Sequence, residues 1–158
     1  MNKVSPAEVY WLYISLKVVH LLAMAVWIGG ATIAPVGLRR SLSLGTAQAA
    51  EFVVHLKRAT RIIIAAGLTT FLSGAALVTA AGVLNVPRRI LVGAALTLLI
   101  FVVGATLGKP AIMRLGHHFD RGGDTALSAP LARRFLLIIN IEMAIRLVVL
   151  LLMVIPIN

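Results

Sequence analysis

The stretch VVHLLAMAVWIGGATIAPVGL, residues 18–38, contains 21 residues and no formal charge. About 18 apolar residues in a row are enough for a helix to cross a hydrocarbon core about 30 Å thick. Similar stretches follow at 62–87, 90–108 and 135–156, the last of which contains Glu142 and Arg146. The pattern predicts four transmembrane helices, because open strands leave their backbone groups unsatisfied in lipid.

The composition of the whole chain supports this prediction. Of its 158 residues, 60% are hydrophobic and only 13% are charged, whereas about a quarter of the residues of a soluble domain are charged. A soluble globular enzyme is therefore excluded. The absence of cysteine excludes disulfides, thiolate metal sites and cysteine nucleophiles. The net charge of +10 does not indicate nucleic-acid binding, since the basic residues lie between apolar runs.

We expect an all-α fold, a polytopic four-helix bundle that forms a single transmembrane domain over residues 1–158. The expected spans are approximately 10–38, 56–83, 88–109 and 133–156, with loops at 39–55 and 110–130. Ser5-Pro6-Ala7-Glu8 is a capping box with proline just inside the helix start. Similar helix starts are expected at 85–87 and 128–130, and a flexible loop at 116–128. Pro35 and Pro110 lie near span ends, where a kink or a stop is expected.

Lysine and arginine are distributed unevenly between the two ends of the spans. One end holds Arg39, Arg40, Lys57, Arg58, Arg61, Lys109, Arg114, Arg121, Arg133 and Arg134, and the other holds at most Lys3, Lys17, Arg88 and Arg89. Because cytoplasmic loops carry the excess of positive charge, both termini are expected on the outer, periplasmic side of a bacterial inner membrane. The basic loops are expected to face anionic lipid, with an acidic partner as the alternative.

Two ionisable residues lie within the last span. Such residues cost roughly 2.5 to 3.5 kcal/mol each at mid-helix. Glu142 and Arg146 are one turn apart, in the favourable order for an intrahelical pair. Two interpretations stay open. The pair either neutralises itself and locks the bundle, or Arg146 faces a carboxylate or propionate of a ligand while Glu142 orients it or relays protons.

His20 lies in the outer half of the first span, with Met24 one turn deeper and Trp27 two turns deeper. A neutral imidazole inside an apolar helix suits haem iron or copper, and it can equally form an interhelical hydrogen bond. Met24 is a second candidate metal ligand. Small residues at 73–76 and 93–95, expected at the same depth, allow either close helix packing or room for a flat macrocycle.

Basic residues are expected near the outer boundary, above His20. Lys17, Arg88 and Arg89 could bind two propionates by charge-assisted hydrogen bonds, or extend to lipid headgroups. The other histidines are less suited to a cofactor: His55 falls on the opposite side of the membrane from His20, and His117 with His118 lies in an expected loop.

The segment LKVVHLLAMAVWIGG, residues 16–30, is similar to the first helix of two groups of four-helix bacterial membrane proteins. These groups are the HemJ-type protoporphyrinogen oxidases and the copper resistance protein D (CopD) domains. The positions that carry the resemblance are Lys17, His20, Trp27 and Gly30. Arg58 with Arg61, and Asn140-Ile141-Glu142, also resemble elements of HemJ helices two and four.

The HemJ resemblance implies haem b bound at His20 and oxidation of protoporphyrinogen IX to protoporphyrin IX. The lysine that opens the third helix of that family is absent here, where Arg88 and Arg89 stand instead. The CopD resemblance implies copper handling at the membrane.

We therefore expect an integral membrane haem-b-binding redox protein with His20 as an axial ligand. The cofactor-binding residues expected around it are Lys17, Met24, Arg88, Arg89, Glu142 and Arg146. One alternative is a copper-handling protein that uses His20 and Met24, with Met143 or Met153. Another is a non-catalytic membrane subunit or assembly factor. The expected partners are the bilayer, a porphyrin or quinol substrate, and a homo-oligomer or membrane complex.

Overall fold

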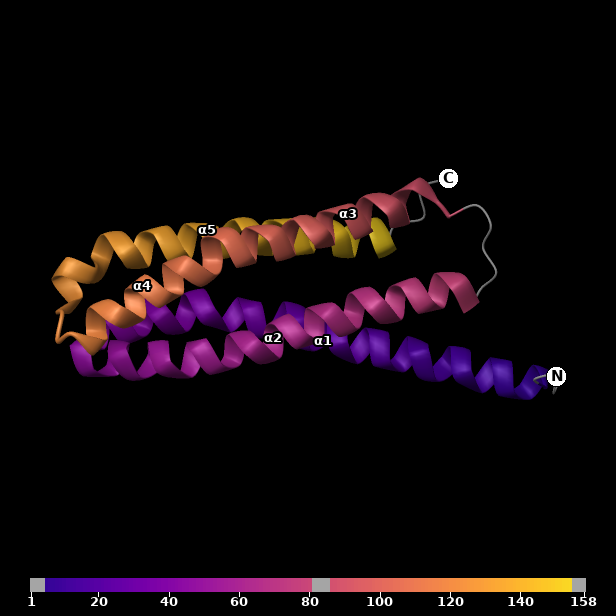
Figure 1. The fold of residues 1–158 in the computed structure, drawn as a ribbon, viewed down its shortest axis with the longest axis horizontal. Coiled ribbons are helices and arrows are strands. Elements are labelled where there is room, and N and C mark those ends of the chain that lie inside the picture. Colours follow the sequence, from indigo (N-terminus) through magenta and orange to yellow (C-terminus); the bar gives the residue numbers. More distant parts are fainter. Residues whose placement is uncertain (1–4, 81–85, 155–158) are drawn as a thin grey trace.

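The computed structural model describes residues 5–80 and 86–154, and these form helices almost throughout. The elements are α1 (Pro6–Leu44), α2 (Thr46–Ala80), α3 (Arg88–Val103), a π-helical turn η1 (Gly104–Gly108), α4 (Lys109–Asp120) and α5 (Thr125–Val154) (Figure 1). Elements α3, η1 and α4 follow one another without a break. Four helices are thus long and apolar enough to cross a membrane, which confirms the all-α, four-helix prediction. The orientation of the termini stays a prediction.

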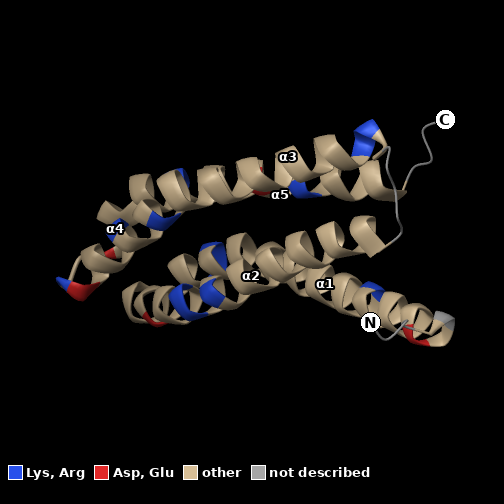
Figure 2. Cartoon of the chain, turned by 45° about the vertical axis from the view of Figure 1, so that its right-hand side comes forward, with Lys and Arg blue, Asp and Glu red and all other residues tan. Residues whose placement is uncertain are grey.

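The helices form two antiparallel pairs, α1 with α2 and α3 with α5 (Figure 1). Helix α4 connects the pairs because it packs against both α2 and α5. The apolar core lies mainly at this end of the bundle. It consists of Ala34, Leu38, Ala49, Val53, Leu56, Ala111, Ile112, Leu115, Phe119, Ala132, Phe135 and Ile138. Many of the lysines and arginines surround the same end, and others lie at the start of α3 and along α1 (Figure 2).

The first helix begins as the sequence predicts. The Ser5 N–H donates to Glu8 Oε2 over 2.7 Å, and the Glu8 N–H donates to Ser5 Oγ over 3.3 Å. This reciprocal capping box satisfies two backbone donors that the first turn of a helix would otherwise leave unpaired. The connection between α1 and α2 is the single residue Gly45. Its φ of 118° is a conformation that glycine tolerates best.

Both predicted loops are corrected by the structure. Residues 39–55 are helical apart from Gly45, and the 110–130 segment is helical except at 121–124. The expected flexible loop at 116–128 is reduced to the same short turn. The charges in these segments did not mark breaks in the helices, because α4 is amphipathic: it buries Ile112 and Leu115 and exposes Arg114.

The predicted helix starts and stops near proline also differ from the structure. Helix α5 begins at Thr125, so Pro130 lies inside it, in an exposed position where one missing backbone donor is tolerated. Pro35 lies within α1 and does not end it. Helix α3 begins close to the predicted position, at Arg88 after Pro87. Asn85, the first residue of the predicted 85–87 start, is outside the described residues.

The π-helical turn η1 explains how the third span continues through Pro110. The Lys109 N–H donates to the Gly104 carbonyl, five residues earlier instead of four. Proline has no N–H and its ring clashes with the preceding turn of an α-helix, and a wider turn relieves such a clash. π-turns of this kind occur frequently at functional sites.

Candidate functional site

His20 connects α1 to α2 through one ring nitrogen. Its Nδ1 lies 3.0 Å from the Thr70 carbonyl oxygen and 3.1 Å from Ser73 Oγ. A carbonyl oxygen can only accept, so Nδ1 carries the proton. The Ser73 hydroxyl donates to the Thr69 carbonyl, so its oxygen is also able to accept from Nδ1. In the neutral ring, Nε2 then holds the lone pair.

Glycine on α2 makes room for this ring. A Cβ atom at Gly74 would lie 3.1 Å from His20 Cε1, closer than side chains normally approach. The predicted small residues beside His20 are therefore confirmed for Ser73 and Gly74. They are not confirmed for Gly93, whose nearest side chains are Met153 and Val149 of α5, at 3.9 and 4.0 Å from a Cβ built there. The reason is that α3 packs mainly against α5.

The Glu142–Arg146 pair is confirmed. Arg146 Nη2 donates to Glu142 Oε2 over 3.0 Å, and the two residues are only 5% and 7% exposed. Arg146 Nε is buried and has no hydrogen-bond partner among the described residues. The pair is thus a buried ionic contact inside the bundle, and Glu142 already occupies one end of the guanidinium.

Three elements meet at this pair. The Arg146 guanidinium lies 5.2 Å from the centre of the Trp27 ring of α1, within range for a cation–π interaction. On the other side, Cβ atoms at Gly104 and Gly108 would each lie 3.4 Å from Glu142 Oε1. The pair is therefore enclosed between α1 and the π-turn.

The sequence did not predict these neighbours. In the sequence, Trp27 stands out only for its position relative to His20, and nothing links Gly104 or Gly108 to Glu142. Trp27 also stacks on Phe101 of α3, with ring centres 6.3 Å apart. A tryptophan and an arginine that both fall at mid-span were the available signal, since aromatic rings stabilise desolvated guanidinium groups.

The two polar sites share one face of α1 but do not touch. Trp27 lies seven residues after His20, which places it two turns away, about 10 Å along the helix axis at 1.5 Å per residue. The residues predicted to bind one cofactor therefore lie at two separate places along α1. Lys17 and Met24 lie one turn on either side of His20, exposed and half-buried respectively. Arg146 instead lies over the Trp27 ring and pairs with Glu142.

Arg88 and Arg89 begin α3, which belongs to the other helix pair (Figure 1). Their role in holding propionates above His20 stays a prediction.

Metal-ligating side chains are dispersed. Within residues 5–80 and 86–154, no group of three or more histidine, cysteine, aspartate or glutamate residues could hold a metal ion. His55 is exposed and lies 3.6 Å from Glu51, and His118 Nε2 lies 2.9 Å from the Asp124 carbonyl oxygen. A metal at His20 would depend on that one imidazole from α1 and on ligands of other types.

Comparisons of the chain with protein-family models, with curated proteins and with solved structures find no match. The geometry of the described residues thus carries the functional argument.

Proposed function

We propose that this chain is an integral membrane protein that binds haem b through Nε2 of His20 and takes part in electron transfer. The observation that supports this most directly is the hydrogen bonding of His20 Nδ1, which lies 3.0 Å from the Thr70 carbonyl oxygen and 3.1 Å from Ser73 Oγ. Metal-bound histidines almost always donate their second ring N–H to such an acceptor, which fixes the ring and raises its basicity as a ligand. The resemblance of residues 16–30 to HemJ proteins agrees with this role.

The residues on either side of His20 suit the two ends of a haem group. Lys17, exposed one turn away, supplies a cation for a propionate, while half-buried Met24 supplies apolar contact on the deeper side. A bound haem would supply one-electron chemistry with a membrane donor such as a quinol or porphyrinogen. The protein's own part is to fix the imidazole and to keep its surroundings apolar.

In this proposal the buried ion pair has a supporting role. Arg146 pairs with Glu142 and lies over Trp27, so it holds α5 against α1 two turns from His20. This assignment favours the structural interpretation of the pair over direct contact with a ligand.

The proposal is tested by the haem content of three purified proteins: wild type, His20→Ala and His55→Ala. His55 is the matched control because it is exposed on α2 and lies 3.6 Å from Glu51. We expect wild type and His55→Ala to carry the same amount of haem per chain and His20→Ala to lose most of it. Full haem retention in His20→Ala would contradict the proposal.

A copper-handling function is the second candidate, favoured by the position of Met24 one turn from His20 and half-buried. Thioether and imidazole ligands together suit Cu(I). Copper without porphyrin in the purified protein would favour copper over haem. The copper should then be lost in both His20→Ala and Met24→Ala and retained in the exposed-site control Met113→Ala. Porphyrin without copper in the purified protein would exclude the copper-handling function.

A further inference from the structure

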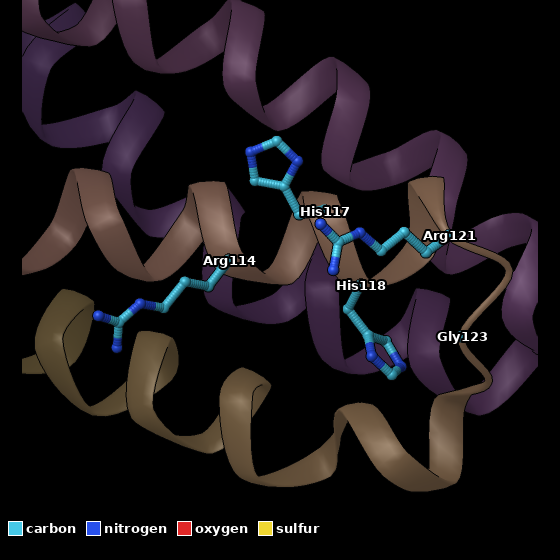
Figure 3. A pocket seen from close by; sticks show the side chains of 5 residues that line it. All are labelled: Arg114, His117, His118, Arg121 and Gly123. Carbon is cyan, nitrogen blue, oxygen red and sulfur yellow. The ribbon is translucent and has the colours of Figure 1, made fainter.

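Two cavities flank α4 at the basic end of the bundle. The larger, about 540 Å³, is lined by Arg114, His117, His118, Arg121 and Gly123 (Figure 3). In Figure 3, Arg114 and His118 point towards α5, whereas His117 points to the other side of α4. The smaller cavity, about 170 Å³, lies between α4 and α5 and is lined by residues that include Leu107, Pro110, Arg114, Leu131 and Arg134. Arg114 lines both, so the cavities are adjacent.

The positive charge at these cavities is not neutralised by nearby carboxylates. Within residues 5–80 and 86–154, no carboxylate oxygen lies within 4.0 Å of Arg114, Arg121 or Arg134. The two nearest acidic residues in sequence are engaged elsewhere. Asp120 lies 4.0 Å from Lys57, and Asp124 Oδ1 accepts the Leu127 N–H over 2.9 Å at the start of α5. The arginines are thus available to an anion from outside the chain.

The smaller cavity combines this charge with an apolar wall. Leu107 and Pro110 precede Arg114 by about two turns and one turn on the same side of the rod formed by η1 and α4, and Leu131 precedes Arg134 by one turn on α5. Apolar side chains therefore line part of this groove, and two arginines also line it. Leu107 is 45% exposed, so the apolar part of the groove reaches the outer surface of the bundle.

We propose that the cleft between α4 and α5 binds an anionic phospholipid. Arg114 and Arg134 hold its phosphate by charge-assisted hydrogen bonds, and one acyl chain lies along Leu107, Pro110 and Leu131. Basic pockets between transmembrane helices recognise such headgroups. A soluble anion would account for the arginines alone, but it would leave the apolar wall that leads to them without a role.

The test compares thermal unfolding of the detergent-purified chain with added phosphatidylglycerol, phosphatidylcholine of the same acyl chains, or inorganic phosphate. A ligand that binds the folded state raises the unfolding temperature with its concentration. We expect phosphatidylglycerol to stabilise the wild type and the other two additives to have little effect. Equal stabilisation by phosphatidylcholine or by inorganic phosphate would overturn the proposal.

A double variant, Arg114→Gln with Arg134→Gln, removes both proposed phosphate contacts at exposed positions. Its apparent affinity for phosphatidylglycerol should fall about a hundredfold, since each of the two charge-assisted contacts is worth about tenfold. The matched control is Arg39→Gln with Arg40→Gln, two exposed arginines at the end of α1. An equal loss in both double variants would show general surface attraction and overturn a specific site.

A third variant separates lipid from other anionic ligands. Leu131→Trp fills the groove while keeping both arginines, and Leu131 is half-buried at the edge of the core. It should lower the affinity for long-chain phosphatidylglycerol severalfold but leave the weak response to inorganic phosphate unchanged. Unaltered binding of phosphatidylglycerol would show that the acyl chain does not lie in the groove.

Discussion

Replacing Arg146 alone with leucine should destabilise the bundle far more than replacing Arg146 and Glu142 together. The single change leaves the Glu142 carboxylate buried, 7% exposed, without the guanidinium that lies 3.0 Å away. Breaking a buried pair in this way costs about 3 to 5 kcal/mol, and loss of the stacking on Trp27 adds about 0.5 to 2 kcal/mol.

The double change removes both charges at once. Two leucines, one of them beside Gly104 and Gly108, avoid the desolvation penalty of the ions, and such replacements are often neutral or stabilising by about 1 to 4 kcal/mol. The expected coupling energy between the two positions is therefore on the order of 3 kcal/mol or more.

The assay is reversible unfolding in mixed micelles as the denaturing detergent is increased, followed by tryptophan fluorescence. Trp27 stacks against Arg146 and Phe101, so its emission reports on this part of the bundle. The control is Glu51→Leu with His55→Leu, an exposed pair at the same i,i+4 spacing on α2, whose single and double variants should differ by no more than about 0.5 kcal/mol. A double variant at 142 and 146 as unstable as the worse single variant would refute the reasoning.

Two glycine substitutions test the close contacts. Gly74→Ala places a methyl group 3.1 Å from His20 Cε1 and should displace the ring and lower the haem content. The control Gly29→Ala, with nothing within 4 Å of its Cβ, should leave the haem content unchanged. Equal haem content in the two variants would contradict the contact. Gly67→Ala places its Cβ 2.7 Å from Trp27 Nε1 and should destabilise the bundle by about 1 to 3 kcal/mol in the same unfolding assay; a loss under about 0.5 kcal/mol would contradict it.

Features set by local sequence were predicted correctly. The capping box at Ser5 and Glu8 and the pair of Glu142 with Arg146 each depend on residues three or four apart, whose spacing in a helix is fixed. The four apolar helices follow from the cost of exposing a backbone to lipid. In each case the physical constraint is contained in a short segment of sequence.

Features that depend on how helices pack could not be predicted in this way. The charge pattern at 39–55 and 110–130 predicts loops, yet polar residues continue a helix when its other face packs, as Leu115 does in the core. The cation–π contact of Trp27 with Arg146 joins residues more than a hundred positions apart, and α3 pairs mainly with α5. Helix register and pairing decide both.

The absorption spectrum of the detergent-purified wild-type protein, oxidised and then reduced, tests the central claim most directly. If Nε2 of His20 is an axial ligand, the spectrum shows a Soret band that shifts on reduction, with haem in a fixed ratio to folded protein. A folded, monodisperse preparation from haem-supplied cells that shows no Soret absorption in either state would contradict the account.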